Sequence, residues 1–354
     1  MPLPSGRMAT VDALRGIASF GVAWFHFTHG NPDFLPAGLL KSSGEYGWLG
    51  VQMFFVISGF VIPCALYKAQ YELPQYGRFL AKRIIRLDPP YFADICLVLA
   101  LAYVVPLAPM FHGPPVRYTF PQLLGHLGYA NSLIGKPWVN PVFWSLGIEF
   151  QYYLLVGLIF PLLVASNRVI RLALIVALLV LSGPLISRPS LIFGWLPLFV
   201  AGILTFQKKV GLLSSCFFTV GLAVVFLIVL IEGRLETAHG FPTAIVMLLT
   251  ALAIAFLTLR ASWLTWLGLI SYSLYLVHVP IGGKVVNLGA RYAHGLYSEI
   301  LVLFLAVTAS IFSAYLLYRA VELPSQRLSS KISYKRASER SSGLALLKTK
   351  TQSV

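Results

Sequence analysis

The sequence predicts an all-α membrane protein with about ten spanning helices. Hydrophobic residues make up 58% of the 354 residues and charged residues only 11%, whereas soluble domains carry about 25% charged residues. Apolar segments of bilayer-spanning length recur along the chain, and Lys and Arg are unevenly divided between the segments that connect them. Together these observations indicate a polytopic membrane protein.

Ten apolar segments are long enough to cross a bilayer, whose core of about 30 Å needs roughly 20 helical residues. The first is a retained helix and not a signal peptide, because it carries Asp12 and Arg15 and no small-residue cleavage site follows it. Pro197 and Gly268 interrupt the sixth and the ninth. The predicted spans are 11–29, 47–66, 91–109, 142–165, 169–187, 190–206, 211–231, 241–259, 264–282 and 297–318.

The distribution of Lys and Arg predicts that both termini are cytoplasmic. With that orientation the inner segments hold 18 of these residues and the outer loops seven, as the positive-inside rule requires. Residues 325–354 contain seven Lys or Arg and one Glu. We interpret them as a disordered basic tail on the anionic leaflet, not as a nucleic-acid-binding region. The predicted domains are therefore a membrane domain, 1–324, and this tail.

Cysteine spacing argues against a metal site. Cys64, Cys96 and Cys216 are far apart, and the sequence contains no CxxC pair. Neither a zinc site nor a disulfide framework is indicated. We expect buried, inert thiols and no bound metal.

A polar stripe runs along the first predicted helix. Asp12, Arg15, His26 and His29 share one face, because spacings of 3, 11 and 14 residues are close to whole helical turns. Arg15 and His26 are about 16 Å apart along the axis, so His26 lies near mid-bilayer if Arg15 lies at an edge. The stripe is either a structural Asp–Arg pair with a hydrogen-bonded histidine, or a site in which His26 is a general base.

A basic cluster precedes the third predicted span. Arg83 and Arg86 are three residues apart on one helical face, with Lys82 beside them. The cluster is either an anchor at the cytoplasmic surface or a site for a phosphate-rich cofactor such as coenzyme A, since arginine forks match phosphate oxygens.

Two further groups of polar residues lie in apolar spans. Glu149 follows Trp144 and Ser145 at the start of the fourth span, where it is an interface carboxylate or the partner of a base or of Arg15. Ser145 is not in a nucleophile elbow, because no GxSxG motif is present. In the ninth span, three polar residues at helical spacing form interhelical hydrogen bonds or line a ligand cavity. They are Ser271, Tyr275 and His278.

Taken in order, these segments resemble the membrane-bound acyltransferase-3 family of sugar O-acyltransferases. The resemblance covers about residues 10–325; each motif alone is weak, but six in family order are specific. The matching residues are Asp12-Ala13-Leu14-Arg15-Gly16 with His26, Gly50-Val51 with Phe54-Phe55-Val56-Ile57-Ser58-Gly59-Phe60, Arg83-Ile84-Ile85-Arg86 with Pro90-Tyr91-Phe92, Phe143-Trp144-Ser145-Leu146 with Glu149, Ser271-Tyr272-Ser273-Leu274-Tyr275-Leu276 with His278, and Val321-Glu322 with Pro324.

The resemblance implies ten membrane helices, an acyl-coenzyme A donor and a carbohydrate hydroxyl as acceptor. It assigns catalysis to His26, Arg15 and Glu149 and donor binding to Arg83 and Arg86, to which we add the neighbouring Lys82. For the acceptor we expect Ser271, Tyr275, His278, Trp144 and Asp12.

The chain departs from the family in small ways. Asp88-Pro89-Pro90-Tyr91 stands where the family more often has a single Pro-x-Tyr, and Gln151 follows Glu149-Phe150. Neither change removes a charged motif residue. Some relatives carry a soluble SGNH esterase-like domain after the last helix. Here about 30 residues follow it, so we expect a standalone form that acts alone or with a partner.

The function we expect is O-acyl transfer, in the first place of acetyl from acetyl-coenzyme A, at the bacterial cytoplasmic membrane. His26 deprotonates the acceptor hydroxyl or, alternatively, carries the acyl group. A cytosolic donor can reach His26 only through a cavity in the bundle, which we therefore predict beside it. The rival hypothesis is a glycan exporter, which would favour two repeated halves with broken helices; no such repeat is visible. The acceptor glycan, the acyl length and a homo-oligomeric state stay open.

Overall fold

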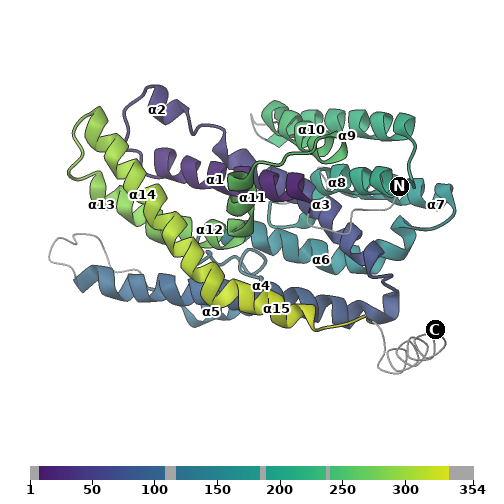
Figure 1. The fold of residues 1–354 in the computed structure, drawn as a ribbon, viewed down its shortest axis with the longest axis horizontal. Helices are drawn as coiled ribbons and strands as arrows, with labels where there is room; N and C mark the ends of the chain where they lie inside the picture. The colour runs from purple at the N-terminus through teal and green to yellow at the C-terminus, as the bar shows by residue number, and fades with distance from the viewer. Residues whose placement is uncertain (1–7, 108–116, 184–188, 237–239, 335–354) are drawn as a thin grey trace, which may run out of the picture.

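Helices form all the regular structure of the described residues (Figure 1). The computed structural model describes residues 8–107, 117–183, 189–236 and 240–334. Within these ranges the chain forms fifteen α-helices joined by short 3₁₀ and π-helical segments, and no strand. This confirms the all-α class. Most of the predicted basic tail, from residue 335 onward, lies outside the described residues, but residues 325–330 are helical, so the prediction of disorder is wrong for them.

Each of the ten predicted spans contains a helix. In order, the corresponding helices are α1 (Ala9–His29), α3 (Gly50–Lys68), α4 (Tyr76–Val104), α6 (Phe143–Leu163), α7 (Arg168–Leu181), α8 (Leu196–Lys209), α9 (Ser215–Glu236), α10 (Gly240–Phe256), the pair α11 (Ser262–Leu269) and α12 (Ser271–Val277), and α14 (Leu296–Leu317).

Shorter elements connect these helices. The remaining α-helices are α2 (Leu39–Ser42), α5 (Phe120–Gly125), α13 (Lys284–Gly289) and α15 (Leu323–Ser330). The 3₁₀ segments are η1 (Gly47–Leu49), η2 (Leu73–Gln75), η3 (Val105–Leu107), η4 (His126–Gly128) and η5 (Ile192–Trp195). Two π-helical segments, η6 (His278–Gly283) and η7 (Tyr318–Glu322), follow α12 and α14.

Five helical runs are long and apolar enough to cross a membrane, or six if the bent pair α11–α12 counts as one span. α1 is long enough, but its polar stripe lowers its hydropathy, and α7, α8 and α10 have only 14, 14 and 17 residues. The total of ten spans and the cytoplasmic placement of the termini stay predictions. The five are 39–68, 73–107, 143–163, 215–232 and 296–330.

Two predicted segments differ in detail from the structure. α4 begins at Tyr76 and not near residue 91, so Arg83 and Arg86 lie inside the helix and not before it. The residues ahead of the apolar span are too polar to resemble a membrane segment, yet most of residues 78–87 are Arg, Lys, Leu or Ala, which are strong helix formers. The ninth segment bends by 58° between α11 and α12, next to Ile270.

Glycines bring α1 into backbone contact with two neighbours. A Cβ atom at Gly50 of α3 would overlap the carbonyl oxygen of Ala18, and one at Gly268 of α11 would overlap that of Asp12. Small residues at helix crossings permit this approach in membrane bundles. α1 is therefore held between α3 and α11.

The crossing of α3 and α8 is equally close. A Cβ at Gly59 would overlap the carbonyl oxygen of Phe199, and one at Gly202 would overlap that of Val56. The ring of Phe199 also stacks on Tyr152 of α6, with ring centroids 4.1 Å apart. This three-helix contact is the centre of the buried core.

The connection between α4 and α6 is tied into the bundle by buried hydrogen bonds. The Asn140 side chain donates to the carboxylate of Asp94 at 2.8 Å and to the carbonyl of Leu276 at 2.9 Å. His126 Nε2 accepts from the backbone N–H of Val139 at 3.3 Å, which places the proton on Nδ1, 2.6 Å from the Tyr91 hydroxyl. Residues 126–140 are thus part of the packed structure, and Asn140 contacts α12.

We predict that Gly59→Ala lowers the free energy of unfolding by about 1–3 kcal/mol, because the added methyl group forces α3 and α8 apart. Thermal unfolding of the purified protein in detergent measures this. Gly77→Ala is the matched control, since a Cβ at Gly77 of α4 meets no atom within 4 Å; it should leave the unfolding midpoint unchanged or raise it. Equal midpoints for Gly59→Ala and the wild type would contradict the prediction.

We also predict that acid loosens the loop around His126. Burial lowers the pKa of His126 from 6.5 to about 4, because a protonated ring would lose solvation and the bond from Val139. The unfolded loop therefore binds more protons between pH 6.5 and 4, and the folded loop loses stability as the pH falls through that range.

Hydrogen exchange of residues 120–140 measures this effect. After correction for the intrinsic rates, protection should be lower at pH 5 than at pH 7. The variant His126→Gln should be less protected at pH 7 and should lose most of the pH dependence. The same pH dependence in His126→Gln would exclude this histidine as the cause.

Candidate active site

A cavity of about 860 Å³, partly open to solvent, lies between α1, α3, α4, α6, α12 and η7. Each of these elements supplies part of its wall. The apolar lining residues are Val51, Phe54, Phe55, Ile57, Val61, Ile62, Leu87 and Leu146, and the polar ones are Arg15, Ser58, Arg83, Arg86, Ser145, Glu149, Tyr153, Tyr272, Tyr275 and Glu322.

Three arginines of this cavity form no ion pair with any carboxylate that the structure describes within 4.0 Å. Arg83 lies over the rings of Phe79 and Tyr153, with its guanidinium carbon 5.6 and 5.5 Å from their centroids. Arg15 Nε donates to the Ser271 hydroxyl at 3.3 Å. Because Arg83 and Arg86 are one turn apart on α4, their free donors face the same space.

Two carboxylates also line the cavity, and each accepts a hydrogen bond from a serine hydroxyl. Glu149 accepts from Ser58 Oγ at 2.7 Å. Glu322, buried in η7, accepts from Ser273 Oγ at 2.6 Å and from the Gln326 side chain at 2.9 Å. With three arginines and two glutamates, the cavity carries one formal positive charge and suits an anion.

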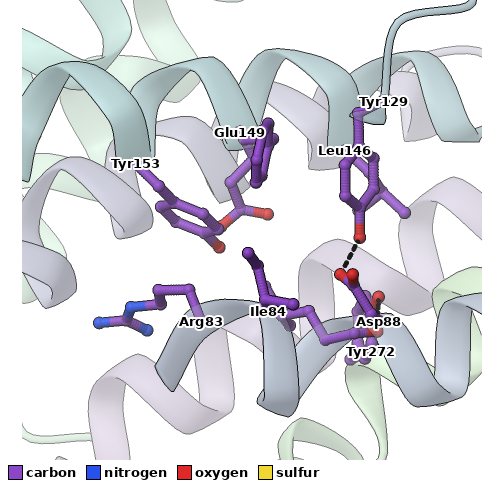
Figure 2. Close-up of a pocket in the computed structure, with 10 residues that line it drawn as sticks. Arg83, Ile84, Asp88, Tyr129, Leu146, Glu149, Tyr153 and Tyr272 are labelled. Carbon is purple, nitrogen blue, oxygen red and sulfur yellow. Dashed lines mark hydrogen bonds between the residues drawn. The ribbon is translucent and has the colours of Figure 1, made fainter. Parts of the chain in front are cut away.

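A smaller hollow of about 280 Å³ adjoins the cavity between α4 and α6 (Figure 2). It shares Arg83, Glu149 and Tyr153 with the cavity. At its far end the Tyr129 hydroxyl donates to the Asp88 carboxylate at 2.8 Å. The hollow is too narrow for more than a small group, and it gives Glu149 space on a second side.

Tyr275 of α12 lines the cavity on the side of the two histidines. Its hydroxyl lies 2.5 Å from Ser145 Oγ and donates to the carbonyl of Val142 at 3.1 Å. Behind Tyr275 stands His278, with ring centroids 5.8 Å apart, and behind His278 stands His26, at 5.2 Å. His26 itself does not line the cavity. We predicted a cavity beside His26; this cavity lies in the bundle but does not reach His26, whose ring contacts that of His278.

Several predicted site residues lie away from the cavity. The Lys82 ammonium group donates to the carbonyl of Ile332 at 3.4 Å and lies over the Tyr334 ring, because its side chain points to the C-terminal segment. Trp144 packs against Trp195, with centroids 5.1 Å apart. Asp12 lies where α1 crosses α11. These three residues are not among those that line the cavity.

We predicted no role in the site for Glu322, although it belongs to the last of the six motifs that match the family. The residue lies more than 300 positions from Arg15 in the chain, and no helical spacing connects them. The available signal was an acid at the end of an apolar helix, where an unpaired carboxylate is costly. The hydroxyls of Ser58 and Tyr153 were missed because such groups usually serve helix packing.

Comparison with known proteins identifies relatives over most of the chain. Residues 8–319 match a family model described as an acyltransferase domain, Acyl_transf_3. The O-acetyltransferase OatA of Staphylococcus aureus is 25% identical over 89% of this chain and 56% of its own length.

Two further relatives match about half of the chain. A protein of Komagataeibacter xylinus named as a membrane-bound transacylase, BcsY, is 31% identical over 48% of this chain and 42% of its own length. A protein of the Acidianus two-tailed virus named as an acetyltransferase, ORF330, is 26% identical over 51% of this chain and 49% of its own length. The chain thus spans about half the length of these relatives. No solved structure matches it.

The family match confirms the resemblance drawn from the six motifs. Among the described residues several apolar helices are long enough to span a membrane, and the relatives are named as acyl-transferring enzymes. The chain therefore belongs to the acyltransferase-3 family, whose acyltransferase domain it carries.

Proposed function

We propose that this enzyme transfers an acyl group, in the simplest case acetyl, from acyl-coenzyme A to a carbohydrate hydroxyl at the bacterial cytoplasmic membrane. The observation that carries the proposal is the set of three arginines around one cavity without an ion pair to any described carboxylate. Guanidinium groups held in this way are ready to bind phosphate oxygens. The names of the relatives support acetyl as the group transferred.

The donor would lie along the cavity. Arg83 and Arg86 would bind its phosphates, and the pantetheine arm would follow the apolar wall that α3 supplies, toward Tyr275. Lys82 has no part in this arrangement, because its ammonium group is directed to Ile332 and Tyr334. The thioester would then be placed next to the layer of Tyr275 and His278.

The acceptor would approach from the other end of α1. His26 is partly exposed and lies one turn from the C-terminal end of this helix. Neutral His26 would take the proton of the acceptor hydroxyl while the oxygen attacks the thioester carbonyl carbon. The C–S bond then breaks, and the thiolate of coenzyme A takes a proton from the imidazolium. Donor and acceptor meet when the Tyr275 ring turns aside.

Arg15 and Glu149 would act on the donor side. The sequence left open that one of them orients the His26 imidazole. However, Glu149 accepts its hydrogen bond from Ser58, Arg15 donates to Ser271, and the ring next to His26 is His278. We therefore propose that Arg15 stabilises the negative charge on the donor and that Glu149 limits the excess of positive charge in the empty cavity.

The exporter hypothesis loses its support. The family and the named relatives are transferases. Among the described helices one bent pair occurs, α11–α12, whereas the transporter folds built on broken helices use them in two corresponding halves.

The donor site is tested by coenzyme A binding to the double variant Arg83→Ala/Arg86→Ala. We expect at least a tenfold loss of affinity in calorimetry, since charged hydrogen bonds contribute about 1.5–3 kcal/mol each. Lys82→Ala on the same helix is the matched control and should bind normally. Unchanged affinity of the double variant, or an equal loss in Lys82→Ala, would exclude this docking.

The general base is tested with His26→Ala. We expect acetyl transfer to fall by about 10²–10⁴ while coenzyme A binding is retained, because His26 lies outside the cavity. Mass spectrometry of O-acetyl groups on the surface glycans of expressing cells, with purified protein for binding, measures both. His29→Ala serves as the control, because His29 stacks on Phe25 in the same helix. Normal acetylation with His26→Ala would refute the assignment.

A further inference from the structure

His278 has one ring nitrogen that is satisfied and one that is not. Nδ1 lies 3.1 Å from the carbonyl oxygen of Leu274. Because a carbonyl only accepts hydrogen bonds, Nδ1 carries the proton and Nε2 presents a bare lone pair. The residue is fully buried, and Nε2 has no hydrogen-bond partner among the described residues.

This lone pair is an unusual feature of a packed interior. A buried acceptor without a donor costs about 1–3 kcal/mol, and native proteins keep few of them. A hydrogen-bond donor that comes within reach of Nε2 only during the reaction would explain why such a group is retained.

The backbone around His278 is built to hold the ring in place. His278 opens the π-helical segment η6, and such wide turns often mark functional sites. A Cβ at Gly282 in this segment would overlap Ser310 of α14 and the Phe27 ring of α1. The segment is therefore pressed between the helix that carries His26 and the last long helix.

The neighbouring titratable group is His26. The two rings have centroids 5.2 Å apart and are tilted by 44°, and the imidazole of His26 makes no hydrogen bond with the described residues. His278 also contacts Tyr275, which lines the cavity. His278 is thus next to both a cavity residue and the proposed base.

We propose that His278 is a positioning residue for His26. His26 takes the proton of the acceptor hydroxyl on one ring nitrogen, and the N–H on its other nitrogen, already present in the neutral ring, turns to donate to Nε2 of His278. The bond orients the imidazole and disperses its positive charge in an apolar surrounding. No proton leaves the pair, and the proton returns from His26 to the thiolate of coenzyme A. This inference rests on the proposed function.

The test compares His278→Leu, which removes the acceptor, with His278→Gln, whose amide oxygen can stand near the position of Nε2. The full-length protein in detergent is assayed by the coenzyme A thiol released from acetyl-coenzyme A with total envelope glycans as acceptor. We expect His278→Leu to lower kcat about tenfold or more with unchanged KM for acetyl-coenzyme A, and His278→Gln to recover much of it.

Two controls separate positioning from packing. Ser310→Ala removes another buried unpartnered group of the same layer and should leave kcat unchanged. In a His26→Ala background, His278→Leu should have little further effect, because the two residues act as a unit. A wild-type kcat for His278→Leu, a change in KM alone, or the same loss in both backgrounds would overturn the inference.

The outcomes also separate this inference from the proposed function. If the wild-type protein neither binds coenzyme A nor releases its thiol, the proposed function fails. If the wild-type protein turns over and His278→Leu does so equally fast with an unchanged unfolding midpoint, only the role of His278 fails.

Discussion

The arrangement of the bundle depends on backbone contact between α1 and its neighbours. Gly50 admits the carbonyl of Ala18, and Gly268 admits that of Asp12. A side chain at either position would push α3 or α11 away from α1. Because α11 leads into α12, this contact also sets where Ser271 meets Arg15. Two positions without a side chain thus fix how the polar groups of three helices come together.

Because α1 is long, its two ends bear different groups of the proposed site. Arg15 belongs to the cavity with Arg83 and Arg86, whereas His26 lies about 16 Å farther along the axis, behind Tyr275 and His278. In the function we propose, the anionic donor and the hydroxyl of the acceptor need different surroundings. The donor needs free guanidinium groups. The acceptor needs a base that lies away from those charges, because nearby cations would lower the affinity of the base for a proton.

The sequence predicted the helices and the main groups of the site, because both follow from local spacing. Apolar runs gave the helix positions, and the spacing of Arg83 and Arg86 gave their common face. It failed where contacts depend on elements distant in the chain. Lys82 shares the basic cluster, but the segment around Ile332 binds it. Glu322 enters the cavity only because η7 packs beside α4. Neither contact has a local signature.

The loop between α4 and α6 helps to fix the positions of Tyr275 and His278, in addition to the packing of the helices. Asn140 donates to the carbonyl of Leu276, between Tyr275 and His278, and also to Asp94 of α4. α12 is therefore fixed at the turn that carries both aromatic side chains, while α1 and α14 press on the π segment that follows. With the backbone held on both sides of His278, motion is left to side chains. In the proposed reaction, Tyr275 would therefore turn aside without displacing the histidine pair.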